Sequence, residues 1–240
     1  MIDWPVLHDA LPEFARGVRV TLTVLAISLA TGLVASVPLA VARVSPRRWL
    51  SLPVWLFTYV IRGTPLLVQL FMIYYGLAQF EWIRESAAWV LLKSAWFCAW
   101  LAFAINTTAY TTEIFAGALR SMPVGDLEAA RSLGMTERQV YVRILLPGAL
   151  RRALPQYGNE VVMMLHATAI ASTVTLVDVT RVARDVYTNH LLPVEAFGMA
   201  AAIYLLLTAA LVGAFRWLES RYLGHLRPAP AAAVPAPVAA

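Results

Sequence analysis

Between two strongly apolar regions of the chain lies the charged stretch EAARSLGMTERQVYVRILLP, residues 128–147. Its residues favour helix, and Gly134 can take the left-handed conformation that ends a first short helix, for which Asp126 is the predicted N-cap. Thr136 and Gln139 have the spacing of a capping box, which predicts a second helix that runs to the end of the stretch. The insert is therefore expected to fold as helix, glycine turn and helix. It is too short and too polar to cross a membrane.

The composition around this insert is that of a membrane protein. Of 240 residues, 60% are hydrophobic and only 14% are charged, and the mean hydropathy is +0.67. The net charge of +5 comes from arginines that stand beside apolar segments instead of forming one patch. That distribution indicates loops facing the cytoplasm and contact with membrane lipid, and it argues against a nucleic-acid partner.

About five segments are long and apolar enough to span a bilayer, for which roughly 20 residues are needed. We place them at 18–42, 52–80, 95–120, 154–177 and 197–215, so that the charged insert connects the third to the fourth. Cys98 falls within the third span, where a buried structural thiol is expected. The sequence thus predicts an all-α polytopic fold.

Arginine in the loops orients these spans. The connection RVSPRRW at 43–49 has three arginines and no acidic residue, and the insert at 120–152 has six arginines against three acidic residues, whereas the other two connections are balanced or acidic. The positive-inside rule then places the N-terminus outside and the insert and C-terminus in the cytoplasm. We expect an external segment at 1–17, a membrane domain at 18–225 and a disordered cytoplasmic Pro/Ala tail at 226–240.

The insert also carries a motif at full spacing. It resembles the EAA signature of ABC-importer permeases, whose fixed positions are filled here by Glu128, Ala129, Ala130, Gly134, Ile144, Leu146 and Pro147. Three more stretches are similar to permeases of the polar amino acid family: FTYVIRGTPLLVQL at 57–70, NTTAYTTEIFAGALRSMP at 106–123 and LPQYGNEV at 154–161. The likeness is greatest to the M-type (HisM-like) permeases of histidine and lysine/arginine/ornithine importers, including opine-type relatives. It covers about 16–225 and implies the MetI-like fold of type I ABC importers.

The resemblance implies a function and a set of partners. It implies a permease subunit of the bacterial inner membrane that forms the pathway for a polar, cationic amino acid: histidine, arginine, lysine, ornithine or an opine-like derivative. Implied partners are a second homologous permease (a hetero-pair rather than a homodimer), a cytoplasmic ABC ATPase dimer that docks on the EAA loop, and an external solute-binding protein. No GxxxxGK[ST] phosphate loop is present. We therefore expect no cofactor and no enzymatic activity on this chain, with ATP and Mg used by the ATPase.

The second span is interrupted by RGTP, comprising Arg62, Gly63, Thr64 and Pro65. Glycine and proline break the helical hydrogen bonds at membrane depth, where broken helices commonly line a substrate pathway. Arg62 could there bind the carboxylate of an amino acid or pair with an internal glutamate. The alternative is a simple proline kink.

Two carboxyl groups lie within predicted spans, where ionisable groups are costly and usually face a cavity or a partner. Glu160, preceded by Asn159, is our first candidate to bind the cationic group of a substrate, and Glu113 is the second. The structural alternatives are a salt bridge from Glu160 to Arg62 and one from Glu113 to Arg120.

His166 is the last candidate for the pathway, although a hydrogen bond between packed helices is the more usual role of such a residue. An intramembrane enzyme would use the two glutamates and His166 as acid and base, but no nucleophile or metal cluster accompanies them. A membrane scaffold that only recruits an ATPase would need the EAA loop but neither RGTP nor buried glutamates. A transport permease accounts for all three features.

Overall fold

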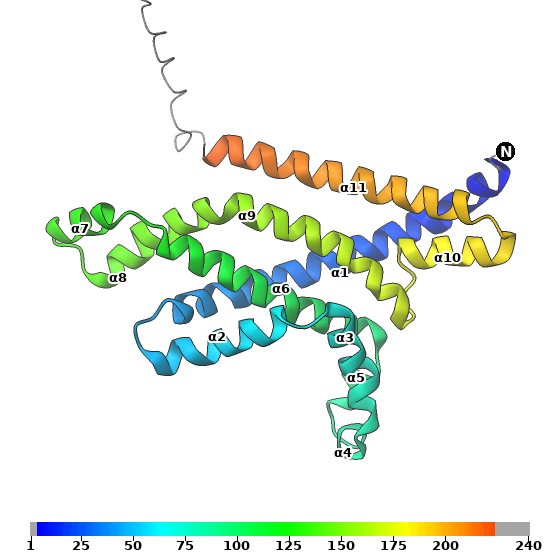
Figure 1. The fold of residues 1–240 in the computed structure, drawn as a ribbon, viewed down its shortest axis with the longest axis horizontal. Helices are drawn as coiled ribbons and strands as arrows, with labels where there is room; N and C mark the ends of the chain where they lie inside the picture. Colours follow the sequence, from blue (N-terminus) through cyan, green and yellow to red (C-terminus); the bar gives the residue numbers. More distant parts are fainter. Residues whose placement is uncertain (1–3, 224–240) are drawn as a thin grey trace, which may run out of the picture.

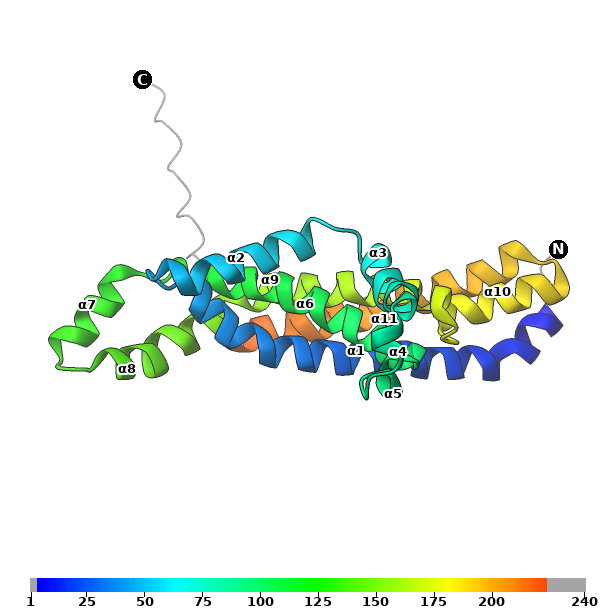
Figure 2. The same ribbon diagram turned by 90° about the horizontal axis from the view of Figure 1, so that it is seen from below.

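The computed structural model describes residues 4–223, which form an elongated bundle of helices without strands in that range (Figure 1). The longer helices run along its long axis in both views (Figures 1 and 2): α1 (Trp4–Arg43), α2 (Arg48–Arg62), α6 (Ala95–Arg120), α9 (Leu146–Ala167) and α11 (Pro193–Tyr222). The short helices α7 (Val124–Ser132) and α8 (Glu137–Gln139) lie together at one end, and the start of α1 lies at the other. The all-helical prediction is confirmed.

Several helices are long and apolar enough to span a membrane. α1 and α11 qualify singly, and two bent pairs qualify when each is counted as one span: Arg48–Arg62 with Leu66–Gln79, bent by 99°, and Glu137–Val174 with Val179–His190, bent by 50°. α6 is outside this set because it carries Asn106 and several threonines, yet its 26 residues reach about 39 Å, more than the ~30 Å hydrocarbon core. The count of five spans remains a prediction.

The helix boundaries differ from the expected spans at three places. α1 starts at Trp4, so that most of the predicted segment 1–17 is helix continuous with the first span. α9 starts at Leu146 instead of near residue 154, because the insert leads into it without a break. An amphipathic helix that the sequence did not suggest, α10 (Val179–His190), precedes α11 and buries one apolar face. The predicted tail at 226–240 lies outside the described residues.

The side of the bundle that carries the broken second span contains the remaining short elements. α3 (Leu66–Phe71) is followed by a π-helical turn (Met72–Gly76) and a 3-10 turn (Leu77–Gln79), and then by α4 (Glu81–Arg84) and α5 (Trp89–Leu92). Figures 1 and 2 show α3 to α5 projecting across the long axis of the bundle. The chain then turns back into α6, where Cys98 is fully buried as predicted.

α6 is the central helix of the bundle, and small residues let α1 approach it closely. Ser28, Gly32, Ser36 and Ala40 repeat at every fourth position of α1 and are buried. A Cβ atom on Gly32 would lie only 2.4 Å from Cγ2 of Thr107 on α6. Small residues at this spacing are typical of helices packed in membranes, where close backbone contact replaces hydrophobic driving force. The polar side of α6 is therefore held at a fixed place among α1, α2 and α9.

Candidate functional site

A cleft of about 1000 Å³ opens between the break in the second span, α6 and α9. Residues from all three elements that the sequence analysis assigned to a pathway line it together: Arg62, Gly63, Thr64, Pro65, Glu113, Asn159 and Glu160. Asn106, Tyr110 and Gln156 line it too and were not predicted. The cleft lies at the upper end of the size range of small-molecule sites in proteins, about 300–1000 Å³.

The break at the end of α2 is a folded structure with specific hydrogen bonds. The Gly63 backbone N–H donates to the carbonyl of Tyr59 at 2.9 Å, and the Thr64 hydroxyl donates to the carbonyl of Val60 at 3.0 Å. These bonds satisfy two of the carbonyl groups that every helix leaves free at its C-terminus. Pro65 then starts α3 at a sharp angle to α2.

Gln69 on α3 completes this structure from beyond the break. Its Nε2 donates to the carbonyl of Ile61 at 2.7 Å and lies 3.0 Å from the carbonyl and 2.8 Å from the hydroxyl of Thr64. Its Oε1 accepts a hydrogen bond from Asn106 Nδ2 on α6 at 3.1 Å. Side chains thus replace the lost helical bonds, which a simple proline kink does not require. The only sequence signal for the contact between Gln69 and Asn106 was that each is a side-chain amide within an apolar span.

The cleft contains a cation and a carboxylate that do not pair directly. The guanidinium carbon of Arg62 lies 5.1 Å from the centroid of the Tyr110 ring, in cation–π contact. Glu160 on α9 is only 8% exposed, and among residues 4–223 no basic group lies within 4.0 Å of it. Arg62 acts on it only as a longer-range charge. The predicted alternative of a salt bridge between the two is therefore absent from the described structure.

Glu113 is engaged in a contact with two other helices. Its Oε1 lies 2.6 Å from Nε of Arg43 on α1 and accepts a hydrogen bond from the Thr58 hydroxyl on α2 at 2.7 Å. The expected partner, Arg120, instead donates to the backbone carbonyl of Arg43 at 3.4 Å. The predicted Arg120 pairing was wrong because Arg43, 70 residues away in sequence, reaches Glu113 where α1 passes α6. Glu113 lines the cleft with its charge already paired.

His166 is not among the residues that line the cleft. Its Nε2 lies 3.0 Å from the hydroxyl of Thr208 on α11. This contact corresponds to the alternative role of a hydrogen bond between packed helices. Among the described residues, no group of three or more His, Cys, Asp or Glu side chains could hold a metal ion.

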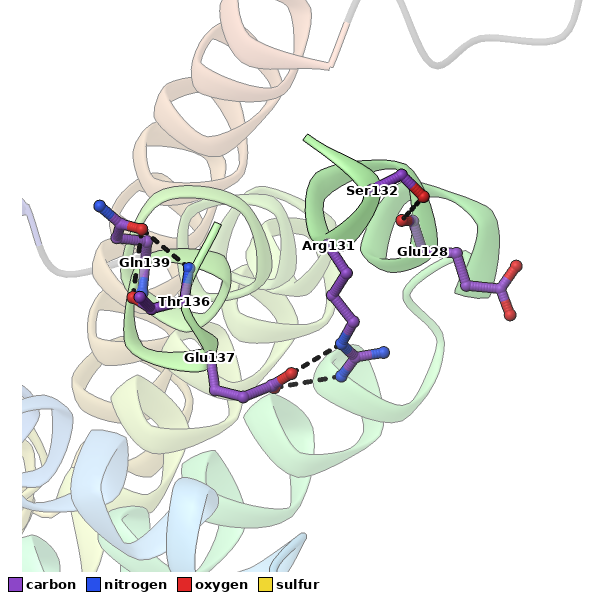
Figure 3. Close-up of polar contacts among 6 residues, drawn as sticks. All are labelled: Glu128, Arg131, Ser132, Thr136, Glu137 and Gln139. Atoms are coloured by element: carbon purple, nitrogen blue, oxygen red, sulfur yellow. Dashed lines mark hydrogen bonds and ion pairs between the residues drawn. The ribbon is translucent and has the colours of Figure 1, made fainter. Parts of the chain in front are cut away.

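The insert has the predicted turn and capping box. Gly134 is left-handed with φ of 77°, and the Thr136 N–H donates to Gln139 Oε1 at 2.8 Å while the Gln139 N–H donates to the Thr136 hydroxyl at 3.4 Å (Figure 3). Asp126 was wrongly predicted as N-cap, because α7 starts two residues earlier, after Pro123. Asp126 lies instead in the first turn, where a negative charge favours the helix dipole.

An ion pair joins the two arms of the insert. Arg131 on α7 donates to Glu137 on α8 through Nε at 2.7 Å and through a terminal nitrogen at 3.1 Å (Figure 3). This hydrogen bond, followed by the charge of Arg131, lowers the pKa of the Glu137 carboxyl from its ordinary value. Both groups are exposed, so that the pair links the arms but adds little stability.

The second arm continues into the membrane helix. The sequence predicted its end at Pro147, but a π-helical turn (Val140–Leu145) carries it directly into α9. Proline has no N–H to donate, and the wider π-turn before it accommodates the missing bond. The insert and the wall of the cleft thus belong to one continuous helical path.

Only part of the EAA-like motif faces outward. Glu128, Ala129 and Gly134 are exposed, and the Glu128 carboxylate points away from the other residues drawn in Figure 3. Ala130 is 4% exposed, and Ile144, Leu146 and Pro147 are half-buried. Leu133, which the motif does not include, is 84% exposed beside the turn. A large apolar residue directly before the turn glycine is the sequence feature that marks this exposed position, and it was not among the predicted site residues.

The family described as "Binding-protein-dependent transport system inner membrane component" matches residues 20–224. The chain belongs to this family. As a member, the permease is an inner-membrane transport component, and its expected membrane-spanning character is confirmed.

Curated relatives of this permease carry transport names. It is 46% identical over 213 residues to the histidine/lysine/arginine/ornithine transport system permease protein HisM of Escherichia coli K12, covering 88% of this chain and 90% of that protein. It is 45% identical over 208 residues to the nopaline transport system permease protein NocM of Agrobacterium fabrum, covering 86% of each chain. The resemblance to M-type amino acid permeases and their opine-type relatives is confirmed.

Solved structures establish the fold of the permease. A chain from an amino acid ABC transporter crystallised with histidines superposes with a TM-score of 0.82 at 31% identity, covering 92% of this chain and 99% of that one. A chain of the MetNI methionine ABC transporter in an inward-facing conformation gives 0.75 at 18% identity, covering 88% and 97%. The expected MetI-like fold is confirmed.

Proposed function

We propose that this permease forms the translocation pathway for a cationic amino acid, such as histidine, arginine, lysine, ornithine or an opine-like derivative. The observation that carries the proposal is the cleft, where a buried Glu160 without an ion pair faces Arg62 across space for a ligand. The names of the relatives, which are transporters of such amino acids, support it.

The charges of the cleft match those of the substrate class. A cationic amino acid has a carboxylate at one end and a positive side chain at the other. Arg62 would bind the carboxylate, and Glu160 with Asn159 would bind the side-chain cation. A buried carboxylate is costly on its own, and the arriving cation would offset this cost. A neutral amino acid lacks that compensation and should bind less tightly.

We further propose that the insert is the surface on which a cytoplasmic ATPase dimer docks. Glu128, Ala129, Leu133 and Gly134 present the outward face, while Ala130 and the half-buried residues Ile144, Leu146 and Pro147 support it from within. The ion-paired arms and the unbroken path into α9 would pass ATPase closure to the cleft as a rigid-body movement.

The remaining features of the proposal follow from the loop charges and the family. The N-terminus and the segment 1–17 would be external, and the insert and the tail at 226–240 would be cytoplasmic, with lipid around the domain at 18–225. A second homologous permease, in a hetero-pair, would complete the pathway, and an external solute-binding protein would deliver substrate. ATP and Mg would be used by the ATPase. The family description supports the solute-binding protein, and the ABC transporter name of the structural relative supports the ATPase.

The test is reconstitution of the permease into liposomes with its ATPase, second permease and binding protein. We expect ATP-dependent uptake of labelled arginine and ATP hydrolysis that rises when arginine and binding protein are added. ATP hydrolysis without uptake would instead support the membrane scaffold. The intramembrane enzyme is disfavoured because His166 contacts Thr208 and does not line the cleft that Glu113 and Glu160 share. Such an enzyme predicts chemical change of a substrate without any ATPase.

A further inference from the structure

Gln69 joins the helix break to the wall of the cleft without lining the cleft itself. Its amide nitrogen is hydrogen-bonded to Ile61 and Thr64 of the break, and its amide oxygen accepts from Asn106 of α6. Two of these three partners line the cleft: Thr64, two residues after Arg62, and Asn106 on the facing helix. The residue therefore stands behind the binding surface and in contact with two of its walls.

Gln69 is also a donor to the end of α2 that comes from another helix. The carbonyls of Tyr59 and Val60 accept hydrogen bonds from Gly63 and Thr64. These two donors directly follow α2 in the chain. The Tyr110 hydroxyl lies 3.5 Å from the carbonyl of Arg62, too long for a strong bond. The 2.7 Å bond from Gln69 to Ile61 thus joins the last turn of α2 directly to α3, across the break.

The loss of this bond has a definite structural consequence. The Ile61 carbonyl would keep only the Thr64 hydroxyl, which lies 3.3 Å away and also donates to the Val60 carbonyl at 3.0 Å. The loss of a hydrogen bond at such a half-buried group costs about 0.5–1.5 kcal/mol. The residue one helical turn further along is Pro65, which has no backbone N–H and cannot replace the lost donor. The end of α2 would then be less firmly held against α3, and with it the position of the Arg62 guanidinium over the Tyr110 ring.

We infer that Gln69 is a positioning residue that holds Arg62 where its guanidinium meets the carboxylate of the substrate. The inference rests on the proposed function, in which Arg62 binds that carboxylate. Asn106 belongs to the same arrangement because it fixes the orientation of the Gln69 amide, with its oxygen toward α6 and its nitrogen toward the break.

The experiment measures recognition of the carboxylate alone. The permease complex with its ATPase and second permease is placed in lipid nanodiscs without the binding protein, which would discriminate between ligands itself. Bound radiolabelled L-arginine is displaced by unlabelled L-arginine or by L-argininamide, which lacks the carboxylate. The ratio of the two affinities is compared among the wild type, Arg62→Met, Gln69→Met and Gln69→Glu.

Gln69→Met removes the amide at similar volume, and Gln69→Glu keeps the shape and the acceptors but cannot donate. Both are expected to lower the preference for arginine over argininamide about 10-fold, as for a charged hydrogen bond that is lost. Arg62→Met should show the same loss, and adding Gln69→Met to it should cause no further loss. The control Gln79→Glu, the same change at an exposed glutamine of the 3-10 turn, should keep the wild-type ratio.

The outcomes separate the inference from the proposed function. If Arg62→Met loses the preference while both Gln69 variants keep it, the positioning role is wrong and the proposed function stands. Equal loss of affinity for both ligands in the Gln69 variants would show a structural role only, and would likewise overturn the inference. If Arg62→Met itself keeps the preference, both fail. Should the Gln69 variants not assemble, Asn106→Leu is measured by the same ratio with the same criterion.

Discussion

The contact among Arg43, Thr58 and Glu113 predicts how the wall of the cleft is stabilised. Replacing Arg43 by methionine keeps the length of the side chain but removes the guanidinium that lies 2.6 Å from Glu113. The two side chains are only 18% and 17% exposed, so that the contact is partly shielded from water. A hydrogen bond to a charged group contributes about 1.5–3 kcal/mol, and we expect Arg43→Met to cost about 2 kcal/mol. For a domain of this size, that corresponds to a fall of about 4–8 °C in the melting temperature.

The assay is thermal unfolding of the purified permease complex in nanodiscs, with a double-mutant cycle of Arg43→Met and Glu113→Gln. The double variant should be less destabilised than the sum of the single ones, because each single change removes the same contact. Arg120→Met is the matched control, since Arg120 donates only to the Arg43 carbonyl at 3.4 Å. A larger loss in Arg120→Met than in Arg43→Met, or strict additivity of the cycle, would refute this assignment.

Three further predictions concern the insert. Gly134→Val should cost about 1–2 kcal/mol, because the residue has φ of 77°, and should reduce the amount of ATPase that co-purifies; an unchanged yield would contradict the docking role. Leu133→Asp should weaken ATPase binding without lowering the melting temperature, since the side chain is 84% exposed; Val194→Asp, at a 78% exposed residue in the first turn of α11, is the control. The Arg131–Glu137 pair should be present above the ordinary glutamate pKa of 4.5 and lost as the pH falls through the lower pKa of the folded state. Spin labels on the two arms should therefore move apart only at such acidic pH, and Arg131→Gln should abolish this pH dependence.

Local spacing predicted the features that depend on neighbours in sequence. The capping box of Thr136 and Gln139 and the left-handed Gly134 follow from backbone chemistry within a few residues, and the structure has both. RGTP was likewise recognisable as a break, because glycine and proline act on the helix in which they stand.

The contacts that were missed depend on how helices pack. Arg43 meets Glu113 across 70 residues only because small residues on α1 let it pass close to α6. Gln69 and Asn106 are two amides in apolar spans, and their pairing depends on the 99° bend between α2 and α3. α10 was not predicted because its 12 residues are too few to span a membrane. Its apolar face packs on α1 and α11 instead.

The central claim is that Glu160 recognises the cationic group of the substrate, and the binding of two ligands to one variant tests it most directly. The permease complex in nanodiscs is titrated with L-arginine and with L-citrulline, its neutral counterpart, in the wild type and in Glu160→Gln. Loss of one charge-assisted hydrogen bond should weaken arginine about 10- to 100-fold and leave citrulline within about 3-fold. Equal weakening of both ligands, or unchanged affinity for arginine, would contradict the assignment of Glu160 and with it the proposed basis of substrate selection.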